Sequence, residues 1–134
     1  MTATKKFLIE QFDIFNEKIF ENKLVIPDFN LFTSRSGPVG MFRINKKNGK
    51  PKIWINNSIE WTEETLISTL IHEMIHYYIC FMGLKDTNSH GVIFTKIAKN
   101  ISVKSGILIT ATTSSDGYSI RQKNKKYKIM IFTY

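Results

Sequence analysis

"LIHEMIHYYICFMGLKDTNSHGVIF", residues 70–94, contains all three histidines of a 134-residue chain. His72 and His76 are four residues apart, and on a helix this spacing places both side chains on one face, one turn apart. Two imidazole nitrogens placed in this way can bind one metal ion at about 2.0–2.1 Å. Glu73 follows the first histidine, and in the pattern H-E-x-x-H this carboxylate can take a proton from metal-bound water. The stretch therefore predicts a zinc site with Glu73 as general acid/base.

The residues around this pattern are typical of a capped amphipathic helix. Thr62 is a good N-cap, and Glu63 and Glu64 in the first turn complement the helix dipole. Gly83 marks the C-terminal end, after about residue 82. The alternative is a helix whose two histidines only satisfy neighbours in a core, but a chance match to the whole pattern in such a helix is rare. An apolar stripe runs along four turns and consists of Leu66, Ile67, Leu70, Ile71, Met74, Ile75 and Tyr78.

A third ligand is expected, because a catalytic zinc takes three protein ligands and keeps one position open. His90 follows a polar loop that can bring its ring back over the metal, and Asp86 in that loop is the competing candidate. Glu60 and Glu64 are less favoured, because they lie upstream of the motif. Imidazole is a good neutral zinc donor, so His90 is preferred to Asp86.

Other side chains near the motif have weaker claims to a role. Cys80 lies one turn after His76 and would close the site as a fourth ligand, but a small buried hydrophobe is the simpler interpretation. Tyr77 and Tyr78 are candidates for stabilising an oxyanion, although the apolar stripe favours core packing for Tyr78. Two arginines, Arg35 and Arg43, are further candidates that the sequence alone does not position.

The rest of the chain alternates helical and strand patterns, which predicts an α+β fold. Asn48-Gly49 is a strong hairpin signal between two of the strands. We expect helices at 4–21 and about 90–102, strands at 28–35, 41–44 and 52–56, and three short strands after residue 106.

These elements predict one domain, 1–134, with a core of about 4–105 and a C-terminal β-rich segment, 106–134. The single cysteine excludes intramolecular disulfides and cysteine-rich zinc modules. No signal peptide and no apolar run of membrane-spanning length occurs, so we expect a cytoplasmic protein without a membrane partner.

The net charge of +8 is compatible with DNA or another acidic partner. Clustered basic residues at 46–52 and 121–128 are interpreted first as solvated turns.

"HEMIH" (72–76) followed by "HGVIF" (90–94) resembles the SprT-like family of zinc metalloproteases, which has H-E-x-x-H and then H-G-x-x-F. "FNEKIFENKL" (15–24) is similar to the first helix of that family and its exit, and "KIWINNS" (52–58) to the strand before the catalytic helix. The resemblance covers about residues 7–105. Many relatives carry a cysteine-rich zinc ribbon after the protease core, whereas this chain has no cysteine beyond Cys80.

The resemblance implies that His72, His76 and His90 bind Zn²⁺ and that Glu73 is the general acid/base. It also implies a compact zincin-like domain. We expect a short antiparallel sheet to pack on the H-E-x-x-H helix of this domain, and a β-hairpin region to follow at the C-terminus. The predicted function is a zinc-dependent endopeptidase acting on a protein or peptide, with DNA-associated proteins as a candidate class. The alternative is a nucleic-acid-binding module with a structural or vestigial zinc. The sequence does not predict an oligomeric state.

Overall fold

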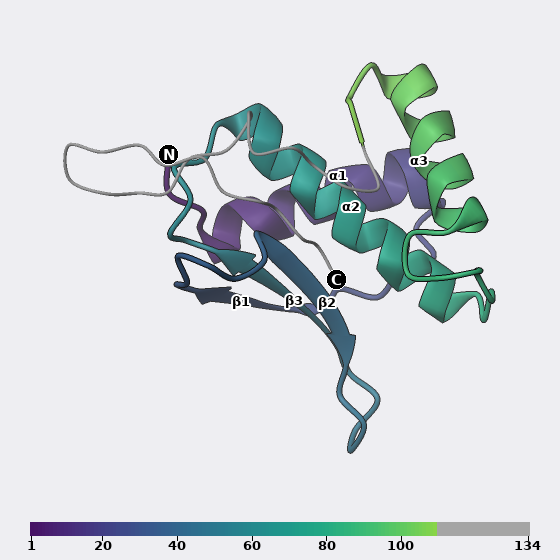
Figure 1. Cartoon of the computed structure of the whole chain (residues 1–134), viewed down its shortest axis with the longest axis horizontal. Coiled ribbons are helices and arrows are strands. Elements are labelled where there is room, and N and C mark those ends of the chain that lie inside the picture. Colours follow the sequence, from purple (N-terminus) through teal and green to yellow (C-terminus); the bar gives the residue numbers. More distant parts are fainter. Residues whose placement is uncertain (110–134) are drawn as a thin grey trace.

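Three helices and a three-stranded sheet make up residues 1–109, the part of the chain that the computed structural model describes. Figure 1 shows α1 and α2 lying across one face of the sheet, with α3 beside α2. The α+β class predicted from the sequence is therefore confirmed for this part of the chain. The elements are α1 (Lys5–Phe20), β1 (Asp28–Phe32), β2 (Gly40–Ile44), β3 (Pro51–Asn56), α2 (Glu63–Phe81) and α3 (Val92–Ser105).

The sheet has the strand order β1-β3-β2 and is mixed. β2 and β3 form the predicted antiparallel hairpin, in which Gly49 has a φ of 69°. β1 pairs with β3 in parallel, so the expectation of an antiparallel sheet is wrong for this strand. The reason is the connection 33–39, which carries the chain from one side of β3 to the other before β2 begins. Buried Asn56 holds this connection, since its side-chain amide donates to the carbonyls of Ser34 (2.7 Å) and Pro38 (3.1 Å).

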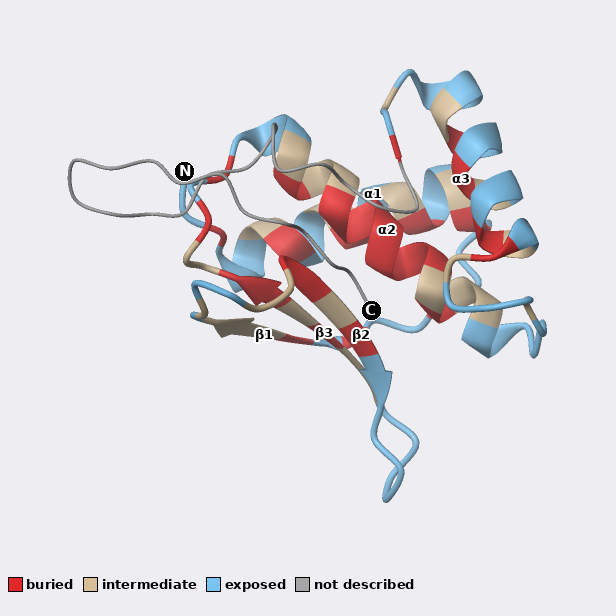
Figure 2. Ribbon diagram, in the orientation of Figure 1, coloured by how far each residue is buried: buried red, intermediate tan, exposed pale blue. Residues whose placement is uncertain are grey.

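The hydrophobic core lies between the sheet and the two long helices. Phe29 on β1 and Phe42 on β2 both pair in register with Ile53 on β3, and all three are buried. Alternation along each strand directs these side chains toward the helices. Figure 2 shows the buried residues concentrated along the middle of α2 and in parts of the strands. α2 is therefore held on several sides through its middle turns, which contain the H-E-x-x-H pattern.

The ends of α2 agree with the local signals in the sequence. Thr62 is the N-cap and forms a capping box with Thr65, whose backbone N–H lies 3.1 Å from the Thr62 hydroxyl oxygen. Gly83, with a φ of 65°, takes the left-handed conformation just after the helix. α3 begins at Val92, close to the predicted start, and extends to Ser105 because Gly106 (φ 75°) ends it.

Two further expectations concern the ends and the environment of the chain. The C-terminal β-rich segment, predicted for 106–134, falls largely on residues 110–134, which lie outside the described residues. Within residues 1–109, no helix combines the length and the apolar character that a membrane crossing requires.

Candidate metal centre

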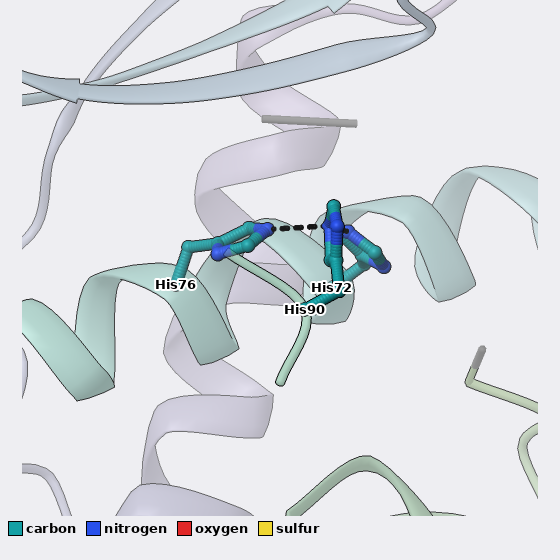
Figure 3. A group of neighbouring side chains, drawn as sticks. All are labelled: His72, His76 and His90. Atoms are coloured by element: carbon teal, nitrogen blue, oxygen red, sulfur yellow. Dashed lines mark hydrogen bonds between the residues drawn. The ribbon is translucent and has the colours of Figure 1, made fainter. Parts of the chain in front are cut away.

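The three histidines converge on one point, as Figure 3 shows. The Nε2 atom of His90 lies 3.1 Å from Nε2 of His72 and 3.1 Å from Nε2 of His76. One ligand atom from each residue lies within 4.8 Å of the other two. His72 and His76 come from adjacent turns of α2, and His90 comes from the loop that precedes α3. The helix spacing accounts for the first pair, and the position of α3 against α2 supplies the third ring.

The two separations that involve His90 fit a tetrahedral metal ion. Nε2 of His90 carries either one proton or one lone pair, so it can form only one of the two possible hydrogen bonds to its neighbours. Two nitrogens bound to the same tetrahedral zinc at about 2.0–2.1 Å would lie roughly 3.3 Å apart, close to the 3.1 Å found for both pairs. Three imidazoles are also a donor set that zinc accepts in catalytic sites. The residues therefore fit zinc.

The protonation of the histidines also suits metal binding. Burial lowers the pKa of His76 to about 4, with smaller contributions from the charges of His90 and Arg43. Burial also lowers the pKa of His90. Both rings are therefore neutral at pH 7, which is the form that donates an electron pair to a metal.

Glu73 is fully buried, with a relative exposure of 0%, and follows His72 in the chain. Neither of its carboxylate oxygens has a hydrogen-bond partner among the described residues. Burial raises the pKa of Glu73 well above its ordinary value, and the positive charge of Arg43 opposes this rise only in part. An unpartnered buried carboxyl costs free energy, so it is expected where a proton has to be transferred rather than where a fold has to be stabilised.

Gly40 allows β2 to approach this carboxyl closely. A Cβ atom at position 40 would lie 3.1 Å from Oε2 of Glu73 and 3.0 Å from Cγ2 of Thr69. These separations are tight, so any larger residue would press on Glu73 or move β2 away from α2. In the sequence Gly40 indicates only a turn, because its contact with Glu73 joins residues 33 positions apart.

Asp86, the competing ligand candidate, has a different role in the structure. Its Oδ1 atom accepts hydrogen bonds from the backbone N–H groups of Thr87 (2.8 Å) and Ile93 (3.0 Å), and Oδ2 accepts one from Phe94 (2.8 Å). The N-cap residue of α3 is Gly91, which has no side chain to cap the helix. Asp86 instead satisfies the free N–H groups of Ile93 and Phe94 in the first turn, and the Thr87 hydroxyl accepts from Val92. Desolvation raises the pKa of Asp86, but hydrogen bonds from Phe94, Ile93 and Thr87 outweigh it, so the pKa lies below its usual range.

The cap requires a glycine at position 91. A Cβ atom there would collide with the carboxylate of Asp86 and the hydroxyl of Thr87. The pair Asp86–Gly91 therefore fixes the start of α3 immediately after His90, and with it the direction from which the third imidazole enters the site.

Phe94 contacts all three histidine rings and is itself fully buried. Its ring centroid lies 4.7 Å from that of His72, 4.7 Å from that of His76 and 5.0 Å from that of His90. The side chain thus limits the rotation of each ring. Sequence reasoning gave Phe94 no role of its own, although it ends the "HGVIF" segment that carries the family resemblance.

The family model described as SprT-like matches residues 8–114, which is most of the chain and includes every element of the site. The chain belongs to the SprT-like family. No curated protein gives a match. The SprT-like region extends a few residues beyond the described part of the chain.

Asp86→Ala should weaken zinc binding by this SprT-like protein about 10- to 100-fold, because partners that orient metal ligands typically contribute that much. The reason is loss of the cap that fixes α3 and His90, not loss of a ligand. Asp86→Asn keeps one acceptor and should have a smaller effect. Competition with a chromogenic chelator measures the affinity, and Asp13→Ala on the exposed face of α1 is the control. Equal affinities for all four proteins would contradict this role of Asp86.

Two of the weaker ligand candidates lie elsewhere in the SprT-like domain. The carboxylate of Glu60 is 2.8 Å from the N-terminal amine, and Glu64 is exposed in the first turn of α2. Cys80 is not part of the converging group, and it is exposed, so its expected burial as a small hydrophobe is wrong. The last turn of α2 extends past the core, as the exposure of the following Phe81 and Met82 also shows.

The residues considered as oxyanion stabilisers differ in what they contact. The hydroxyl of Tyr77 donates to the carbonyl of Val25 at 2.7 Å, so it is already engaged. Tyr78 packs against Phe20 with ring centroids 5.3 Å apart, in agreement with the core role favoured by the sequence. The positive charge of Arg43 is close enough to influence the pKa of both Glu73 and His76. Of the four candidates, Arg43 is therefore the one whose charge acts on Glu73 and His76.

Proposed function

We propose that this SprT-like protein is a zinc-dependent endopeptidase. The observation that carries the proposal is the position of a buried carboxyl without a hydrogen-bond partner, Glu73, on the helix that supplies two of three converging imidazoles. His72, His76 and His90 would hold the metal. Zinc supplies Lewis acidity, which lowers the pKa of coordinated water toward about 7 and polarises the carbonyl of a substrate.

Glu73 provides the proton transfers that peptide hydrolysis needs. It accepts a proton from the attacking water and later delivers that proton to the amine nitrogen of the leaving fragment. Its raised pKa brings the carboxyl nearer to the pH at which both transfers are efficient. A metal site with a purely structural role has no use for such a group, which favours the peptidase over a nucleic-acid-binding module.

β2 offers a way to align a peptide with the site. It is an edge strand of the sheet formed by the described residues, and α2 lies against it. An extended substrate can add to this edge through backbone hydrogen bonds, which do not depend on sequence. We propose proteins or peptides in extended conformation as substrates, and the net charge of +8 makes DNA-associated proteins a candidate class among them.

Hydrolysis of casein should depend on zinc. Protein treated with a chelator and then freed of it should show only background cleavage, and one equivalent of Zn²⁺ should restore the activity. Mass spectrometry of the fragments, with water labelled by ¹⁸O, shows whether each cut is a hydrolysis. The proposal fails if the zinc-loaded protein leaves casein and a mixed peptide library intact. Salt-sensitive DNA binding without any hydrolysis would instead support the nucleic-acid-binding alternative.

A further inference from the structure

A pocket of about 340 Å³ adjoins the metal centre on the side of the C-terminal half of α2. We call it the α2–β2 pocket. Its volume lies near the lower end of the range of roughly 300–1,000 Å³ typical of ligand sites, so it suits one side chain rather than a large molecule. Its lining comes from α2 (His76, Ile79, Cys80), from β2 (Phe42, Arg43, Ile44) and from Ser89 beside the third ligand.

Phe42 is the buried residue of the pocket lining, and an aromatic partner holds its ring in place. The ring of Phe42 is buried and stacks on Tyr77, with centroids 5.2 Å apart and an interplanar angle of 14°. The Tyr77 hydroxyl is in turn held by the carbonyl of Val25 at 2.7 Å. A pocket built on such a fixed aromatic pair keeps its shape when it is empty, and this reduces the entropy lost when a side chain enters.

The walls are mainly apolar and open to solvent. Ile44 is 36% exposed, Ile79 is half-buried, and Cys80 is exposed. Covering apolar surface of this kind is favourable, and a charged guest would lose hydration without gaining a full set of hydrogen bonds. Arg43 also borders the pocket.

The pocket is continuous with the reacting centre, because His76 is both a wall of the pocket and a member of the converging triad. Phe42 and Ile44 alternate along β2, so both point to the same side of this edge strand. Every second side chain of a peptide added to β2 would point to that same side. The side chain of a residue that flanks the scissile bond would then lie at the mouth of the pocket.

From this geometry we infer that the α2–β2 pocket is a specificity subsite, which takes a medium-sized or large apolar side chain of the substrate residue that flanks the scissile bond. The inference rests on the proposed peptidase function and specifies its substrate class. Discrimination by an apolar pocket is typically about 10- to 200-fold for a small change in hydrocarbon, so leucine and phenylalanine should be preferred to alanine by at least about tenfold.

Peptide binding to zinc-loaded Glu73→Gln protein tests the subsite without turnover. The probes are labelled peptides of alanine and serine that differ in one central guest residue: Leu, Phe, Ala, Asp or Lys. Fluorescence anisotropy should show the Leu and Phe peptides binding at least about tenfold more tightly than the other three. In the same background, Ile44→Lys should remove most of this difference with the zinc content unchanged. Ile14→Lys on α1 is the matched control, since Ile14 is 40% exposed and does not line the pocket.

The single cysteine provides a second probe of the same pocket. Benzyl methanethiosulfonate should attach a bulky group to Cys80 and weaken binding of the Leu peptide, whereas the methyl reagent should have a smaller effect. Cys80→Ser should abolish the response to both reagents.

Equal binding of the Leu and Asp peptides, no detectable binding of any guest peptide, or an unchanged preference in Ile44→Lys would overturn the subsite. None of these results depends on catalysis, because the Glu73→Gln protein supplies the binding data. Cleavage of casein by the wild-type protein decides the proposed function separately.

Discussion

Glu73→Gln should lower the rate of peptide hydrolysis by about 10²–10⁴-fold, the usual contribution of a positioned general acid/base, and leave one zinc bound per chain. Glutamine has nearly the same shape but cannot accept and return the proton. The ligand residues are unchanged, so the loss should appear in kcat with little change in KM. A fluorogenic peptide gives the kinetics, and elemental analysis gives the zinc content.

Glu64→Gln is the matched control for this substitution, because Glu64 is an exposed carboxylate on the same helix. The stability of the metal-free protein separates chemistry from folding. The carboxyl of Glu73 is buried without a hydrogen-bond partner in the described part of the chain, so its replacement should leave the melting temperature unchanged or raise it. Hydrolysis by Glu73→Gln at the wild-type rate would exclude Glu73 as the base.

His90→Ala should remove most of the stabilisation that zinc gives to the fold. A ligand present at 100 times its dissociation constant stabilises the native state by about 2.7 kcal/mol, and the wild-type protein should show a corresponding rise in melting temperature. With one of three imidazoles missing, the same zinc concentration should give little or no rise. Thermal unfolding with and without zinc measures the difference.

Lys85→Ala, an exposed substitution in the same loop, is the control for this experiment. His90 is only partly buried, so the metal-free His90→Ala protein should unfold near the wild-type temperature. Full zinc content and an undiminished thermal response in His90→Ala would show that the third ligand lies elsewhere.

The parts of the fold that follow local rules could be predicted from the sequence. α2 was expected between Thr62 and Gly83, and the structure places it at Glu63–Phe81, because the N-cap, the apolar period and the glycine stop all act within one or two turns. The hairpin of β2 and β3 followed from Asn48-Gly49 for the same reason.

The parts that depend on distant contacts could not be predicted in this way. No local signal shows that β1 lies parallel to β3, since this depends on the path of residues 33–39. The contact of Gly40 with Glu73 and the contact of Phe94 with the three imidazoles appear only when β2, α2 and α3 have packed together.

Asp86 shows how a residue type can suggest the wrong role. A carboxylate in the loop between two candidate ligands is a reasonable metal donor by chemistry alone. In the folded chain the N–H groups of Ile93 and Phe94 compete for it, and a helix whose N-cap is glycine has no other side chain to satisfy them. His90 is left as the group that faces the other two imidazoles.

X-ray absorption at the zinc edge of the loaded protein tests the metal centre most directly. We predict three imidazole nitrogens and one further light donor from solvent at about 2.0–2.1 Å, with no sulfur. A sulfur donor at about 2.3 Å, which Cys80 would have to supply, would contradict a centre formed by His72, His76 and His90.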